Sequence, residues 1–289
     1  EQRNAERPKI EVGFLPSRAA ARLHLSGLKD ESGERLYSEA EVEDAVKLGW
    51  IGEEDYRLLI PFRRPSGSIA GFVSRNINFK PEQADNRTKY QYSPGLERKH
   101  LLFNLTRLQG DKRLVLVEGI FDALNASAKG LPNVAALGGV SFSDEQAELI
   151  KRAGAKTVIL LLDADNAGQK ATREIVETLL RKGLKSFVAM FPPGVKDLDE
   201  LLQKKGIEAA KEVLRTPEPD FIYLLNSVIQ AHRKEEPLSG IEEEEFIKDI
   251  THTAAKLDRI SKDRYIKTFL GIDAVRETGI SRDALEAVS

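Results

Sequence analysis

The sequence has 289 residues, of which 41% are hydrophobic, and its net charge at pH 7 is −2. A chain of this length can bury a full hydrophobic core and form two or three compact units. No segment reaches the roughly 20 consecutive apolar residues of a membrane span, and the N-terminus lacks the apolar core of a secretory signal. We therefore expect a cytoplasmic protein with no membrane partner.

The residue types also limit the metal chemistry. The sequence has no cysteine, and its four histidines are scattered. Disulfide bonds and thiolate zinc sites are therefore excluded, and no zinc is expected in this chain. Any metal ion must be held by oxygen ligands.

Residues 1–110 are expected to form a mixed α+β N-terminal subdomain. Apolar positions spaced three to four apart predict mostly helix over residues 9–55. Two short apolar runs within 57–75 then predict a β-hairpin whose turn uses Pro65 and Gly67. The following polar stretch, residues 78–95, contains Pro and Gly and indicates a long loop.

Positive charge is concentrated between residues 56 and 107, where ten Lys or Arg and three Asp or Glu give +7. Isolated basic residues are usually solvated surface charges, whereas binding of a polyanion needs concentrated positive charge. The clustering favours contact with nucleic acid or nucleotide phosphates. The candidate residues are Arg63, Arg64, Arg75, Arg87 and Lys89.

Residues 111–215 alternate between apolar runs and helix-length amphipathic segments. The runs occupy residues 113–117, 133–137, 157–162 and 186–191. This alternation predicts an α/β unit, a parallel sheet with helices on its faces, in which active sites lie at the carboxyl ends of the strands. From residue 216 to 289 the apolar spacing predicts a helical C-terminal subdomain.

Acidic residues follow three of the predicted strands. Glu118 ends the first strand, Asp163 and Asp165 follow the third, and Asp197 and Asp199 follow the fourth. Side chains two apart in an extended segment point to the same side. Clustered carboxylates repel one another unless a cation neutralises them, and hard oxygen ligands favour Mg²⁺ or Mn²⁺. All five are therefore candidate metal ligands, and Glu118, Asp163 and Asp165 are candidate catalytic residues.

A single Asp-x-Asp sequence is more often a capped turn than a metal site, but recurrence at three strand ends favours the metal site. The segment 166–171, NAGQKA, opens a predicted helix of about 15 residues. Gly168 allows close backbone approach there, and the positive end of the helix favours nearby carboxylates and phosphates.

The motifs VEGIFDAL (117–124), LLDADNAGQKA (161–171) and KDLDE (196–200) resemble the three successive motifs of the TOPRIM domain. Bacterial primases, topoisomerases and some nucleases share this domain. The resemblance implies that Glu118 acts as a metal ligand or general acid/base and that the matching aspartates hold Mg²⁺. It also implies supporting roles for Gly119 and Asp122.

Upstream, LLIPFRRPSGSIAGFVSRNI (58–77), KYQYSPG (89–95) and HLLFNL (100–105) resemble the core of DnaG-type primases. This resemblance implies DNA-templated synthesis of RNA primers, with single-stranded DNA and nucleoside triphosphates as partners. Arg75 and Lys89 are then expected to face phosphates, with Arg63 and Arg64 in the same basic hairpin.

Other functions are possible with the same acidic cluster. A TOPRIM nuclease would use water as the nucleophile, and a non-catalytic module would only bind single-stranded DNA. A topoisomerase would need a tyrosine nucleophile in a separate helical domain, which this sequence does not suggest. Primases of this type usually carry a zinc ribbon before the core and a helicase-docking domain after it. The start at Glu1 therefore suggests an excised core, and contact with a helicase is expected only through regions outside this chain.

Overall fold

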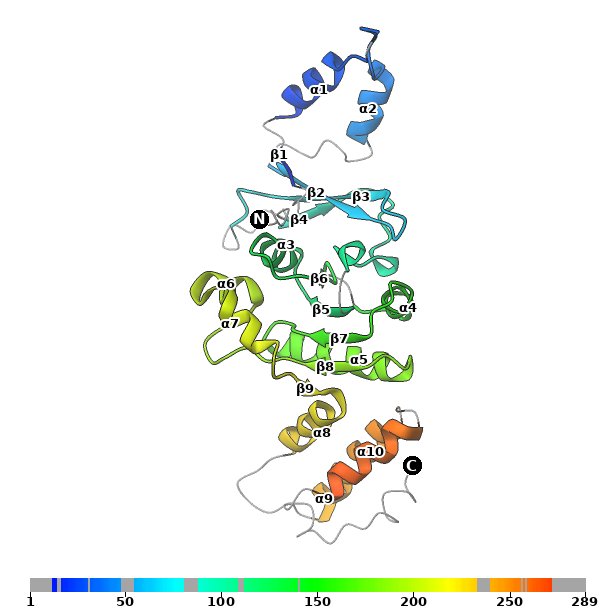
Figure 1. Ribbon diagram of the computed structural model, residues 1–289, viewed down its shortest axis with the longest axis vertical. Helices are drawn as coiled ribbons and strands as arrows, with labels where there is room; N and C mark the ends of the chain where they lie inside the picture. The colour runs from blue at the N-terminus through cyan, green and yellow to red at the C-terminus, as the bar shows by residue number, and fades with distance from the viewer. Residues whose placement is uncertain are drawn as a thin grey trace, which may run out of the picture.

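The computed structural model describes residues 12–14, 17–30, 32–47, 55–80, 88–108, 112–139, 141–232, 240–255, 257 and 259–271. Its elements follow one another along the longest axis of the molecule in nearly chain order (Figure 1). Two helices lie at the top, followed by a four-stranded sheet, a five-stranded sheet and a group of three helices. The candidate phosphate contact Arg87 lies outside the described residues.

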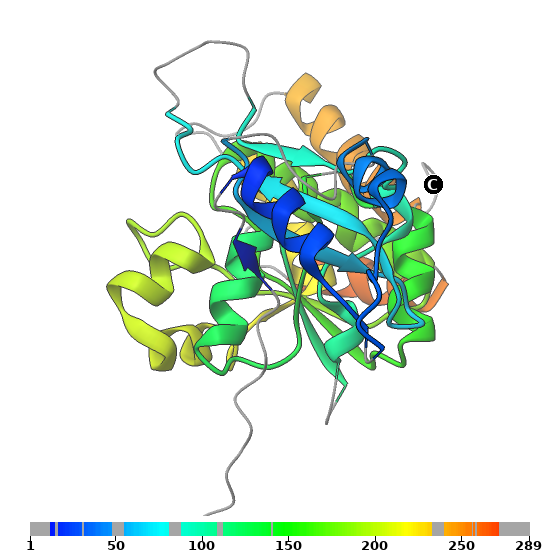
Figure 2. The ribbon, with the colours of Figure 1, turned by 90° about the horizontal axis from the view of Figure 1, so that it is seen from above.

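The N-terminal part contains an antiparallel sheet of order β1-β2-β3-β4. Its elements are β1 (Gly13–Phe14), α1 (Arg18–Gly27), α2 (Glu39–Lys47), β2 (Leu58–Arg63), β3 (Ile69–Arg75) and β4 (Tyr90–Tyr92). Figure 2 shows α1 crossing in front of this sheet. The predicted hairpin is confirmed as β2–β3, and Gly67 in its turn has a φ of +87°, which favours glycine.

The structure differs from the expected loop at 78–95, because β4 pairs with β3 there through Val73 and Tyr92. Two short 3-10 helices, η1 (Arg98–His100) and η2 (Leu105–Arg107), then lead to the second sheet.

The second sheet has the order β6-β5-β7-β8-β9. Its strands are β5 (Arg113–Val117), β6 (Val134–Ala136), β7 (Thr157–Leu160), β8 (Ser186–Val188) and β9 (Glu218–Pro219). The first four are parallel, as the sequence predicts, and β9 adds an antiparallel edge. Adjacent positions in β5, β7 and β8 are Val115, Ile159 and Phe187, so the carboxyl ends of these strands are neighbours.

Helices cover both faces of this sheet. They are α3 (Ile120–Ala128), α4 (Asp144–Arg152), α5 (Asn166–Arg181), α6 (Leu198–Lys204), α7 (Gly206–Val213) and α8 (Asp220–Ala231). Leu116 and Leu160 point to the face that packs against α4, α5 and α8. Val117 and Ile159 point to the opposite face, which shares one core with α3, α6, α7 and strands β2 and β3. The two sheets are therefore joined by a common hydrophobic core.

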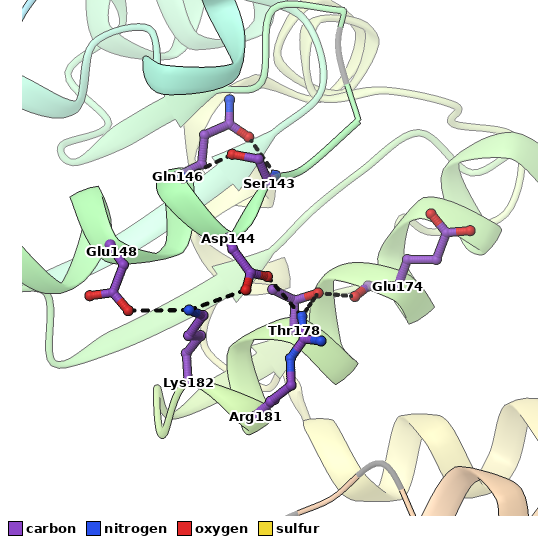
Figure 3. A network of polar contacts seen from close by, with 8 residues as sticks. All are labelled: Ser143, Asp144, Gln146, Glu148, Glu174, Thr178, Arg181 and Lys182. Carbon is purple, nitrogen blue, oxygen red and sulfur yellow. Dashed lines mark hydrogen bonds and ion pairs between the residues drawn. The ribbon is translucent and has the colours of Figure 1, made fainter.

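Polar contacts fix the position of α4 against α5 (Figure 3). Ser143 and Gln146 form a capping box at the start of α4. Asp144 accepts a hydrogen bond of 2.8 Å from Arg181 and pairs with Lys182 at 3.1 Å. This network joins two helices, α4 and α5, that pack on the same face of the five-stranded sheet.

The C-terminal part is helical, as expected, with α9 (Gly240–Ala255) and α10 (Arg259–Leu270). Phe246, Ile250 and Phe269 from these helices join the core that contains α8. Among the described residues, no helix is long and apolar enough to cross a membrane.

Candidate active site

The carboxyl ends of β5, β7 and β8 bring the three acidic motifs together. The Ala164 amide, between Asp163 and Asp165, donates a 2.8 Å hydrogen bond to the carbonyl of Lys196. Lys196 directly precedes Asp197. The second and third motifs are therefore held side by side by the backbone.

These motifs form one wall of a cleft with a volume of about 330 Å³, here called the intersheet cleft because it lies between the two sheets. The wall from the four-stranded sheet consists of Arg75, Lys89, Tyr90 and Tyr92. The opposite wall consists of Glu118, Gly119, Ile120, Phe121, Asp122, Gly138, Gly139, Asp163, Asp197 and Asp199. Basic side chains thus face clustered carboxylates across the cleft.

Burial and mutual repulsion raise the pKa values of Glu118, Asp122 and Asp163 in this cleft. Burial, together with repulsion from the nearby Glu118 and Asp197 carboxylates, raises the pKa of Asp163 to about 6. Burial also raises the pKa of Glu118, with contributions from Asp165 and Asp122. The carboxylates are close enough to interact, so a cation between them would be favoured.

Asp122 connects the first motif to the third. It is buried, and its pKa is raised to about 6, chiefly by burial. Its Oδ1 accepts a 2.8 Å hydrogen bond from the Asp199 amide. Asp199 in turn accepts hydrogen bonds from Asn125 and, at 2.6 Å, from Gln203. Asp122 therefore holds the start of α6 in place, which gives the supporting role a physical basis.

Two aspartates also cap helices. Asp165 Oδ1 accepts a 2.8 Å hydrogen bond from the Gly168 amide at the start of α5. Asp197 Oδ1 accepts one of 2.7 Å from the Glu200 amide at the start of α6. The capped turn and the acidic cluster are therefore both present in the same segments.

Asp197 and Asp199 both line the intersheet cleft, with Asp197 as the extended N-cap of α6 and Asp199 in the first turn of that helix. Asp165 is not among the residues that line the intersheet cleft. In the described part of the chain, no three His, Cys, Asp or Glu side chains are arranged as a ready metal site. The predicted ligands share one region but do not converge on one point.

Both glycines singled out in the sequence lie against these acids. A Cβ on Gly168 would lie 2.1 Å from the Asp163 carbonyl oxygen, and a Cβ on Gly119 would lie 2.2 Å from Asp122 Oδ2. Neither position has room for a side chain, so both glycines allow close packing of the acidic motifs.

Arg75 and Lys89 project into the intersheet cleft from adjoining strand ends. Arg75 donates a 2.9 Å hydrogen bond to the Tyr90 hydroxyl, and its guanidinium lies 4.7 Å from the centre of the Phe121 ring. Lys89 Nζ lies 5.5 Å from the Tyr90 ring centre. Burial lowers the pKa of Lys89, as do the positive charges of Arg75 and Lys196. The cleft thus concentrates positive charge beside the carboxylates.

Arg63 and Arg64 do not line this cleft. They lie at the β2–β3 turn, where Arg63 donates to the Gly67 carbonyl and Arg64 donates to the Ile69 carbonyl at 2.7 Å. The structure therefore separates them from Arg75 and Lys89.

Comparison with known proteins assigns the segment that carries the acidic motifs to a protein family. Residues 115–202 match the family model described as Toprim-like. The chain contains a Toprim-like domain. The resemblance inferred from the three motifs is thereby confirmed, and the strands that carry Glu118, Asp163 and Asp197 all lie within or beside this Toprim-like domain.

Proteins that match more than two thirds of this chain are DNA primases, and the chain belongs to that family. That of Clostridium acetobutylicum is 30% identical over 231 residues, covering 78% of this chain and 37% of the relative. That of Thermotoga maritima is 30% identical over 213 residues, covering 72% of this chain and 36% of the relative. The chain therefore spans little more than a third of the length of these relatives.

Solved primase structures share the fold. The Aquifex aeolicus primase with zinc-binding and RNA polymerase domains has a TM-score of 0.69 at 23% identity, with 95% of this chain and 64% of that chain covered. The E. coli primase catalytic core has a TM-score of 0.67 at 20% identity, with 94% and 86% covered. The Toprim-like domain and the sheet before it thus form a primase-like catalytic fold.

Sequence reasoning missed a contact between β4 and the Toprim-like domain. Tyr92 and Arg98 both donate hydrogen bonds to the Gly138 carbonyl, at 3.0 and 2.9 Å. The Arg98 guanidinium also lies 3.8 Å from the centre of the Tyr92 ring. Tyr92 and Arg98 are 46 and 40 residues from Gly138 in the chain, so no local pattern could indicate the contact. It holds a glycine loop at the edge of the intersheet cleft.

Proposed function

We propose that this chain is the catalytic core of a DNA primase, which joins nucleoside triphosphates into RNA primers on a single-stranded DNA template. The observation that carries the proposal is the intersheet cleft, in which Arg75 and Lys89 face Glu118, Asp163 and Asp197. Nucleotidyl transfer needs this combination, because a triphosphate requires cationic contacts and the reacting centre requires clustered oxygen ligands.

Arg75 and Lys89 are proposed to bind the triphosphate. Arg75 is held from two sides, by the Tyr90 hydroxyl and by the Phe121 ring, so it loses little further side-chain entropy on binding. Lys89 adds a second positive charge. The Arg75 and Lys89 side chains together favour the displacement of pyrophosphate by stabilising its negative charge. Contacts of this kind bind phosphates without reading bases.

The acidic side of the cleft fits Mg²⁺ or Mn²⁺ in its chemistry. Its donors are carboxylate oxygens, and burial together with their mutual repulsion raises the pKa values of Glu118 and Asp163. These side chains would have to rotate to gather around one ion. Glu118, Asp163 and Asp197 are the proposed primary ligands, with Asp165 and Asp199 beside them. A bound divalent ion would polarise the α-phosphate and favour ionisation of the attacking hydroxyl.

The proposed reaction forms a bond between the 3′-oxygen of one nucleotide and the α-phosphorus of the next. The bond from that phosphorus to the pyrophosphate oxygen breaks, and the proton of the 3′-hydroxyl is lost. Glu118, which lines the cleft with Asp163, is the proposed acceptor of this proton when it does not coordinate the ion.

The template is proposed to be single-stranded DNA. One structural relative is a DnaG primase catalytic domain bound to single-stranded DNA, with a TM-score of 0.68 at 20% identity. The net charge of +7 between residues 56 and 107 supports the same partner. Contact with a replicative helicase is proposed only for regions outside this chain.

The test is an assay of the chain with a divalent ion, labelled nucleoside triphosphates and single-stranded DNA. A primase gives template-dependent extension products. A Toprim nuclease, which would use the same acids with water, gives strand scission, and a binding module gives neither. Scission without extension would overturn the proposal in favour of the nuclease.

A further inference from the structure

A second and larger groove opens on the other side of Asp163. It has a volume of about 770 Å³ and lies between α5 and α8, beyond the carboxyl ends of β7 and β8. We call it the α5–α8 groove. Asp163 lines both this groove and the intersheet cleft. Two cavities therefore meet at one residue of the acidic cluster.

The two cavities differ in charge. The intersheet cleft contains the phosphate-binding candidates Arg75 and Lys89. In the α5–α8 groove the charged lining residues are Asp163, Arg173 and Glu218, which sum to −1. This groove therefore neutralises the phosphates of a nucleotide less than the intersheet cleft does.

The remaining lining suits a nucleoside. Phe191 and Tyr223 are partly exposed aromatic side chains, and Met190 is 67% exposed at the end of β8. Such side chains stack against the faces of bases. The exposed amides Gln169 and Gln230 add neutral donors and acceptors for a sugar. Apolar walls with a few neutral polar groups are typical of sites for uncharged ring systems.

We propose that the α5–α8 groove binds the nucleoside that supplies the attacking 3′-hydroxyl, while the intersheet cleft binds the incoming triphosphate. This assignment rests on the proposed function. It places the two reactants on opposite sides of Asp163, so that the 3′-oxygen and the α-phosphorus approach each other beside this carboxylate. The bonds formed and broken are those of the reaction described above. The proposal adds only the position of the first nucleotide.

The charge of the α5–α8 groove predicts that the 5′-phosphates of the first nucleotide contribute little to its binding. The 5′-phosphates of the first nucleotide do not react, and the groove offers them one arginine, Arg173. Guanosine 5′-monophosphate should therefore serve as the first nucleotide with a KM within about threefold of that of the triphosphate.

The test is dinucleotide synthesis by the full chain on a template that specifies guanosine first and adenosine second. Gln230→Trp fills the groove from an exposed position of α8, and Met190→Ala removes an exposed contact. Gln230→Trp should raise the KM for the first nucleotide by about tenfold and leave the KM for ATP unchanged. Met190→Ala should give the same pattern with a smaller change. Ala128→Trp, an exposed position on α3 outside both cavities, is the matched control.

A second readout does not depend on turnover. Saturation-transfer NMR should detect guanosine 5′-monophosphate bound to the wild-type chain and to Ala128→Trp without added metal, and should detect less with Gln230→Trp. Equal increases of both KM values, or no increase in either, would overturn the groove assignment while leaving the proposed function intact. If the wild-type chain forms no dinucleotide, the proposed function fails and the groove assignment fails with it.

Discussion

The guanidinium carbon of Arg75 lies 4.7 Å from the centre of the Phe121 ring. Arg75 ends a strand of the four-stranded sheet, and Phe121 lies three residues after Glu118 in the Toprim-like domain. This contact therefore connects the basic wall of the intersheet cleft to its acidic wall. Through this contact, the Toprim-like domain orients the positively charged Arg75 side chain of the four-stranded sheet.

Phe121→Leu should weaken nucleotide binding without unfolding the chain. The leucine keeps apolar volume but removes the ring, and a cation–π contact is worth about 0.5–2 kcal/mol. We expect the KM for the incoming nucleotide to rise by about two- to thirtyfold with little change in kcat. In an Arg75→Ala background the same substitution should have almost no effect, because the partner is gone. Equal effects in both backgrounds would show that Phe121 does not act through Arg75.

Arg75→Ala and Lys89→Ala should each weaken binding of single-stranded DNA or nucleotide. Loss of one phosphate contact should reduce the salt slope of single-strand binding by roughly 0.7. Arg64→Ala is the comparison, because Arg64 lies at the β2–β3 turn and not in the intersheet cleft. We expect it to leave nucleotide affinity unchanged. Fluorescence anisotropy at several salt concentrations measures the slopes, and equal slopes in all three variants would make Arg75 and Lys89 ordinary surface charges.

Asp163→Asn should stabilise the metal-free chain at neutral and higher pH. The folded-state pKa of Asp163 is raised from 3.8 to about 6, so the fold favours the protonated form. Its contribution to stability is complete below about pH 4 and is lost as the pH rises through about 6. Allowing for solvent screening, the variant should gain about 1–2 kcal/mol at pH 8 and almost nothing at pH 4. Denaturant unfolding in EDTA at both pH values measures this. A loss of stability at pH 8 would contradict the repulsion inferred here.

Gly168→Ala should destabilise the chain although alanine normally favours helices. The added Cβ would lie 2.1 Å from the Asp163 carbonyl, so the loop that carries Asp163 must move. Overpacking of this kind costs about 1–3 kcal/mol. Gly27→Ala has no atom within 4 Å of its Cβ and should change stability by no more than about 0.5 kcal/mol. Thermal denaturation of both variants makes the comparison, and equal melting temperatures would argue against the close approach.

The parallel sheet was predictable because buried apolar runs such as 113–117 are long enough to distinguish from loops. The shorter strands β4 and β9 were not, since β4 lies beside Pro94 and β9 itself contains Pro219. The run at 186–191 also ends earlier than predicted, with β8 stopping at Val188. Apolar composition extends beyond the hydrogen-bonded strand there.

The acidic motifs were predictable because each follows a strand of the same sheet. The sequence could not show that Asp199 lies inside a helix, because the same two-residue spacing occurs in strands and at helix starts. Contacts between distant segments, such as Arg98 with Gly138, also leave no local signal. The basic hairpin was predictable as a whole, but only the fold separates Arg64 at its turn from Arg75 at its end.

The most direct measurement is template-dependent nucleotide joining by Glu118→Gln and Asp163→Asn in the presence of Mg²⁺ or Mn²⁺. The control is Asp144→Asn, which removes the same charge from an exposed ion pair with Arg181 on the outer helices. We predict that both cleft variants lose synthesis at least about a hundredfold while remaining folded, and that the control retains it. Full synthesis by either purified cleft variant would contradict the assignment of these carboxylates as the reaction centre.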